Sequence, residues 1–121
     1  MQFTIEFYKT VSGQCPVREF LDALKDSDPD DFASVMSGLA KLRNRVYHRP
    51  PLSKPAGDDL FELRHVGKLN TRILYFFMKG RRIVAVHGIR HKGIKIAARD
   101  RETAIERRDD WLERHEKKNK F

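Results

Sequence analysis

The chain has 121 residues, of which 40% are hydrophobic and 35% charged, and its formal net charge is +8. This balance excludes a disordered chain, the single Cys15 excludes an internal disulfide framework, and the longest apolar run, residues 73–78, is too short to span a membrane. We therefore expect one globular domain over residues 1–121, in a reducing cytoplasm, with no membrane partner.

The N-terminal half predicts one strand and two helices. Residues 3–9 alternate apolar and polar side chains with the period of a half-buried strand. A helix with one apolar face is expected from Pro16, because proline suits the first helical turn. Asp28 is expected to cap a second helix that begins at Pro29. Residues 48–59, with three prolines and a glycine, are predicted to be a loop.

The C-terminal half predicts three strands and a helix. Short connections separate three apolar runs, which implies an antiparallel meander of residues 60–65, 71–78 and 82–91. Residues 100–117 carry an apolar stripe and are predicted to form a helix that Asp100 caps. The order β-α-α-β-β-β-α indicates an α+β domain, in which two N-terminal helices pack on an antiparallel sheet and the last helix borders its open face. Residues 117–121 are expected to be a flexible basic tail.

The positive charge is concentrated in one part of the chain. Residues 60–101 hold 11 Lys or Arg against 2 Asp or Glu, whereas residues 1–59 hold 8 against 9 and residues 102–121 hold 6 against 6. A charge that served solubility alone would be spread along the chain. The concentration favours a polyanionic partner, most often nucleic acid, and the alternative is a solvated basic face without a partner.

Strand alternation predicts that Arg64 and Arg72 share the open face on adjacent strands, with Glu62 beside them. Leu74 and Phe76 fall on the same face, so the last helix is expected to cover part of it. Each arginine also has a structural interpretation: Arg64 could form an ordinary charge pair with Glu62, and Arg72 could mark the start of its strand.

Cations surround the end of the last predicted strand. Arg90, Lys92 and Lys95 lie there, although the two lysines could simply form a solvated turn. His87 and His91 cannot share a zinc ion if the strand continues through His91, because four residues span about 13 Å and each ligand must lie about 2 Å from the metal. With no glycine-rich phosphate loop and no acidic magnesium cluster, we expect no metal or other cofactor.

Four segments resemble a known family by their order and spacing: residues 61–64 (FELR), 72–75 (RILY), 87–95 (HGIRHKGIK) and 99–104 (RDRETA). Over about residues 60–112 the sequence resembles the RelE/ParE superfamily of type II toxins, in particular the HigB-like, phage-derived branch. A weaker likeness lies at residues 15–21 (CPVREFL). The resemblance implies the fold given above and cleavage of mRNA on the translating ribosome. It also implies a helix-turn-helix, HigA-like antitoxin, through which the complex could bind operator DNA.

Two departures from the family's pattern bear on the chemistry. His91 stands in place of the first lysine of a Lys-Lys pair, and Ile96 and Ala97 stand in place of Thr-Pro, whereas Lys92 and Lys95 match. The identity of the general base therefore stays open.

A metal-free ribonuclease needs a base for the 2′-hydroxyl, cations for the pentavalent phosphorane and an acid for the 5′-oxygen. Arg64 and Arg72 suit the phosphorane, because a guanidinium can hold two phosphate oxygens, and Glu62 is expected to orient Arg64. The acid, base or binding groups are expected among Lys92, Lys95 and His91.

Four further residues are expected to contact RNA: Lys68, Tyr75, Arg90 and Arg99, although Tyr75 also suits the core. Two rival functions remain. A ParE-like toxin would inhibit DNA gyrase and cut no RNA, and a non-catalytic module would only bind nucleic acid.

Overall fold

The computed structural model describes residues 2–66, 70–91, 93 and 95–116. Its elements are β1 (Thr4–Phe7), α1 (Pro16–Ser27), α2 (Pro29–Lys41), a 3₁₀ turn η1 (Arg45–Tyr47), β2 (Ser53–Gly57), β3 (Leu60–Val66), β4 (Asn70–Met78), β5 (Arg82–His91) and α3 (Ala98–Glu116). None of the helices in these ranges combines the length and apolar character needed to cross a membrane. The predicted α+β class is confirmed, while the expected tail, 117–121, lies outside the described residues.

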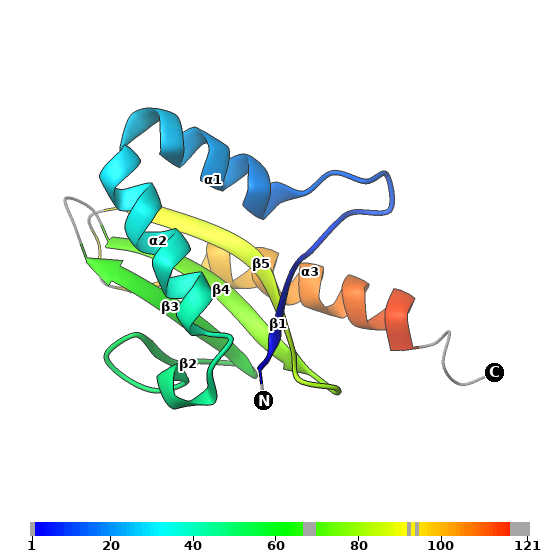
Figure 1. The fold of residues 1–121 in the computed structure, drawn as a ribbon. Helices are drawn as coiled ribbons and strands as arrows, with labels where there is room; N and C mark the ends of the chain where they lie inside the picture. Colours follow the sequence, from blue (N-terminus) through cyan, green and yellow to red (C-terminus); the bar gives the residue numbers. More distant parts are fainter. Residues whose placement is uncertain (1, 67–69, 92, 94, 117–121) are drawn as a thin grey trace.

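The sheet separates two helical layers, with α1 and α2 on one face and α3 on the other (Figure 1). Alternation along β4 fills both layers, since Ile73 and Tyr75 join the core under α1 and α2, and Leu74 and Phe76 join the core under α3. The prediction that the last helix covers Leu74 and Phe76 is confirmed. We call these two sides of the sheet the α1/α2 face and the α3 face.

The two N-terminal helices begin where the sequence predicts. α1 begins at Pro16 and buries one apolar stripe, and the Asp28 carboxylate caps α2 by accepting a hydrogen bond of 3.1 Å from the N–H of Asp31. The prediction for α3 is wrong by two residues. This helix begins at Ala98, so Asp100 lies in its first turn, where its carboxylate bonds to the His87 ring instead of capping the helix.

Within the described residues the sheet has five strands in the order β1-β5-β4-β3-β2, one more than predicted. Residues 53–57, predicted as loop, form the edge strand β2, where Pro55 is tolerated because an edge strand leaves some N–H groups without a ladder partner. Asp58 and Asp59 have φ of 56° and 60°, which suits the tight turn from β2 into β3. The pairings β2–β3, β3–β4 and β4–β5 are antiparallel, whereas β1 lies parallel to β5. After β1, the helices α1 and α2 carry the chain across the sheet to β2 at the opposite edge.

Candidate functional site

Two arginines and a glutamate from neighbouring strands gather on the α3 face. Arg64 of β3 is paired in register with Arg72 of β4, and Glu62 lies two residues before Arg64 on the same face. The Glu62 Oε1 atom is 3.8 Å from the Arg72 Nε atom, and both side chains are buried. The structure thus brings together the two arginines and the glutamate that the sequence singled out.

The two arginines differ in accessibility. The sequence places both on an open face, but Arg72 is only 1% exposed. Its Nη2 donates a 3.1 Å hydrogen bond to the Gly93 carbonyl, which also accepts one of 3.0 Å from Asn70 Nδ2, so the segment after β5 is fastened over the start of β4. Arg64 is half-buried, and its Nε has no hydrogen-bond partner among the residues that the structure describes. Arg64 is therefore the more accessible of the two arginines, and it lines a surface hollow together with Pro51, Leu52 and His65.

The last residue of β5 and the segment that follows it supply the remaining catalytic candidates. His91 Nδ1 accepts a 2.9 Å hydrogen bond from the Gly93 N–H, so the neutral ring carries its proton on Nε2. That Nε2 is buried and meets no hydrogen-bond partner within the described part of the chain. In this arrangement His91 offers no free lone pair to a substrate. Lys95 is exposed and lines a hollow beside Glu62, whereas Lys92 lies outside the described residues.

The hollow contains two cations that sequence reasoning missed. Its volume is about 360 Å³, and it lies between β2, β3 and the start of α3. Lys54 of β2 is paired in register with Glu62, and its Nζ is 3.9 Å from Glu62 Oε1. Arg101 of α3 donates to the Ala56 carbonyl and lies 3.5 Å from Asp58 Oδ2. The only signal for Lys54 would have been strand alternation, which is lost when residues 48–59 are taken as a loop.

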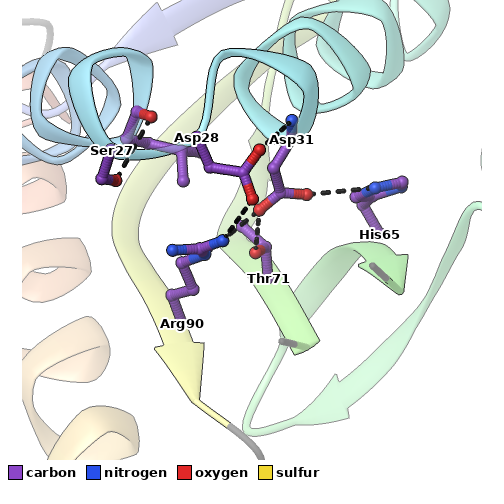
Figure 2. Close-up of polar contacts among 7 residues, drawn as sticks. Ser27, Asp28, Asp31, His65, Thr71 and Arg90 are labelled. Atoms are coloured by element: carbon purple, nitrogen blue, oxygen red, sulfur yellow. Dashed lines mark hydrogen bonds and ion pairs between the residues drawn. The ribbon is translucent and has the colours of Figure 1, made fainter. Parts of the chain in front are cut away.

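Figure 2 shows Arg90 pointing toward Asp28 and Asp31 at the start of α2. Arg90 pairs in register with Thr71 and therefore lies on the α1/α2 face, opposite to the face of the paired arginines. Its guanidinium forms ion pairs of 2.6 Å with Asp28 and 3.3 Å with the buried Asp31. Thr71 donates a 2.5 Å hydrogen bond to Asp31, and His65 Nε2 lies 3.0 Å from its other carboxylate oxygen. These contacts fasten the start of α2 to β3, β4 and β5.

A register shift in β5 explains the position of Arg90. Leu74 of β4 pairs with His87, but the next residue, Tyr75, pairs with Ala85, which leaves Val86 as an extra residue in β5. An extra residue reverses the face of every side chain that follows it in the strand. Arg90, which the sequence analysis expects to contact RNA, therefore points toward α2 and not toward the face of the paired arginines.

The other predicted RNA contacts are dispersed. Tyr75 lies in the core on the α1/α2 face, where its hydroxyl shares a hydrogen bond with Ser53, and burial raises the pKa of that hydroxyl. Arg99 is exposed in the first turn of α3, two residues before Arg101. Lys68 lies outside the described residues.

His87 attaches α3 to the sheet. One ring nitrogen lies 2.8 Å from Asp100 Oδ1, and the other accepts a 3.0 Å hydrogen bond from Arg107, which also donates to the Val86 carbonyl. Burial lowers the pKa of Arg107. β5 continues through His91, so the condition that keeps His87 and His91 from sharing a metal is met, and no cluster of three or more potential metal ligands occurs within the described ranges.

Comparison with known proteins adds one finding. No curated protein matches the chain. A family model described as "Phage derived protein Gp49-like (DUF891)" matches residues 19–109, which run from α1 into α3 and include both paired arginines. The chain therefore belongs to the Gp49-like phage-derived protein family, a family of RelE/HigB-like toxins from toxin–antitoxin systems.

Proposed function

We propose that this protein is the toxin of a type II toxin–antitoxin system and that it cleaves mRNA on the translating ribosome without a metal ion. The family and the concentrated positive charge support this proposal. The observation that carries it is the pairing of Arg64 with Arg72 on one face, beside a buried glutamate and an exposed lysine. We further propose that a helix-turn-helix, HigA-like antitoxin suppresses the activity and mediates any binding to operator DNA.

RNA supplies its own nucleophile in this reaction. The 2′-oxygen attacks phosphorus while a base takes its proton, and the bond to the 5′-oxygen breaks as an acid protonates that oxygen, which leaves a 2′,3′-cyclic phosphate and a 5′-hydroxyl. The Arg64 side chain is only half-buried and lines a surface hollow, so its guanidinium would hold the phosphorane oxygens. Arg72 would add positive charge beside Arg64 from its buried position, and it would hold Glu62 and the Gly93 carbonyl in place.

The acid and base are proposed to come from the lysines after β5. His91 is the least suited of the three candidates in this arrangement, because one ring nitrogen is engaged by Gly93 and the other is buried. Lys95 is exposed at the rim of the hollow and could reach an RNA strand. Lys92 remains a candidate from the sequence alone.

A cell-free translation reaction tests the proposal. The protein would be added to translated mRNA and the ends mapped by primer extension, with parallel samples that lack ribosomes or contain Arg64→Ala. Arg43→Ala is the matched control, because it removes an exposed guanidinium elsewhere on the molecule. We expect new 5′ ends only with ribosomes and with Arg64 present.

The other outcomes separate the rival functions. Cuts without ribosomes would indicate a general ribonuclease. Absence of cuts from a folded protein would refute mRNA cleavage, and a DNA supercoiling assay would then test gyrase as the target.

A further inference from the structure

The hollow beside Glu62 has the chemistry of a phosphate site. Three cations line it, Lys54 from β2, Lys95 from the segment before α3, and Arg101 from α3. Its remaining lining is Glu62 with the apolar side chains of Pro55, Ala56 and Ile96. A cationic rim over a partly apolar floor suits a nucleotide, whose phosphate is anionic and whose sugar and base have apolar faces.

The acidic groups nearby do not neutralise this rim. Glu62 is 4% exposed and is approached from two sides, by Lys54 Nζ at 3.9 Å and by Arg72 Nε at 3.8 Å. Asp58 is 3.5 Å from Arg101 and has a half-exposed side chain. Lys54 is also about half exposed, and its distance from Glu62 is too long for a hydrogen bond, so its ammonium can turn toward a ligand.

The hollow adjoins the proposed catalytic site through Glu62, which lines the hollow and lies beside Arg72, while Arg64 lines a neighbouring hollow. Lys54 and Glu62 form one cross-strand row on the α3 face, and Arg64 and Arg72 form the next row on that face. Lys54 and Arg64 are diagonal neighbours on adjacent strands, about 7 to 8 Å apart, which is similar to the separation of neighbouring phosphates in an extended RNA strand. A strand whose cleaved phosphate lies on Arg64 could therefore place its next phosphate at Lys54.

We propose that Lys54, Lys95 and Arg101 form a second phosphate subsite, which binds the nucleotide adjoining the cleaved bond of single-stranded RNA. The ligand chemistry rests on the proposed ribonuclease function. Lys54 is a binding residue in this scheme and takes no part in bond breaking. Arg101 has a second role, because its contacts with the Ala56 carbonyl and Asp58 hold the start of α3 against β2.

The test uses the full chain and an RNA that cannot be cut. Isotope-labelled protein would be titrated with a 2′-O-methyl hexanucleotide and followed by NMR, with inorganic phosphate alone as a separate titrant. We expect shifts at the amides of Lys54, Ala56 and Ile96. Lys54→Ala should weaken RNA binding about tenfold and reduce the slope of log affinity against log salt by about 0.7, while Lys54→Arg should retain most of the affinity.

Lys79→Ala is the matched control, because Lys79 is an exposed lysine in the turn after β4, at the end of that strand away from Asn70 and Arg72. Unchanged affinity and salt slope in Lys54→Ala, or no shifts at the three amides of the wild type, would overturn the subsite. In the translation assay, Lys54→Ala should raise the concentration of mRNA-bearing ribosomes needed for half-maximal cleavage by a larger factor than it lowers the maximal rate.

The two proposals fail separately. If Lys54→Ala cleaves mRNA with the same concentration dependence as the wild type, the subsite is refuted and the ribonuclease function stands. RNA binding at the hollow without cleavage in the translation assay would remove the ribonuclease and leave the hollow as a binding site for single-stranded RNA.

Discussion

Arg64 and Arg72 stand directly opposite each other on β3 and β4, yet they have different surroundings. Arg72 is enclosed between Glu62 and the Gly93 carbonyl, whereas the Arg64 side chain is half-buried and lines a surface hollow with Pro51, Leu52 and His65. The buried Arg72 charge can strengthen the attraction of the more accessible Arg64 for an anion, because little water screens a buried charge. The pair thus separates ligand binding from positioning, and each role can be tested.

Substitution of Arg64 should affect activity far more than stability. We expect Arg64→Ala to reduce mRNA cleavage by about 100- to 1,000-fold, the usual cost of removing one group that stabilises transition-state charge. Its free energy of unfolding should change by less than about 0.5 kcal/mol, because no hydrogen bond of its Nε is lost. Cleavage rates and urea unfolding would be measured on the same preparations. Arg43→Ala should leave both values unchanged, and a fully active Arg64→Ala protein would contradict the assignment.

Substitution of Arg72 should affect stability as well. Arg72 and Lys54 both approach the buried Glu62 carboxylate, and Arg72→Met leaves it with Lys54 alone of these two cations, at 3.9 Å. Because the buried charge is then poorly compensated, we expect the free energy of unfolding to fall by about 3 kcal/mol. Combining Arg72→Met with Glu62→Gln should recover part of that loss, because the uncompensated charge is then gone. Urea unfolding of both single variants and the double variant gives the coupling energy. Additive losses would show that the two side chains do not interact.

The buried carboxylate of Asp31 should matter much more than that of its exposed neighbour. Asp31 accepts a hydrogen bond from Thr71, pairs with Arg90 and lies 3.0 Å from His65, so Asp31→Ala would leave buried polar groups without their partner. We expect the free energy of unfolding to fall by about 3 kcal/mol.

Asp30→Ala is the matched control, since Asp30 is exposed in the same turn of α2. It should change the free energy of unfolding by less than about 0.5 kcal/mol in the same urea experiment. Similar values for the two alanine variants would mean that the Asp31 network does not hold α2 on the sheet.

Acid should weaken the attachment of α3 to the start of the chain. Hydrogen bonds from Arg114 and Tyr8 lower the pKa of Asp110, and a hydrogen bond from Arg82 lowers the pKa of Glu6. A carboxyl group whose pKa is lower in the folded state contributes stability that is present above its unfolded pKa, near 4, and is lost as the pH falls through the folded pKa.

We therefore expect the free energy of unfolding to fall below about pH 4, with Asp110→Asn making that fall shallower. The contribution of Asp110 should be less than about 1 kcal/mol, because its side chain is more than a third exposed. Urea unfolding at pH 3, 4, 5 and 7 measures this. An identical pH profile in Asp110→Asn would exclude the contribution.

Local patterns were enough to predict most of the elements. Pro16 and the Asp28-Pro29 pair mark helix starts because they satisfy or remove N–H groups that a helix start leaves free, and the meander strands are marked by apolar runs with short connections. β2 could not be predicted in this way, because its lysine, proline and glycine have low strand propensity, and its pairing with β3 holds it in the sheet.

The sequence by itself determined the α+β class, the shared face of Arg64 and Arg72 and the concentration of positive charge, because these follow from local periodicity and composition. Only the tertiary structure decided that Arg72 is buried and that Lys54 and Arg101 join the site, since both depend on segments far apart in the chain. The extra residue in β5 decided the face of Arg90. The position of this extra residue is set by the pairing of β4 with β5, and it cannot be predicted from the alternation of side chains along one strand.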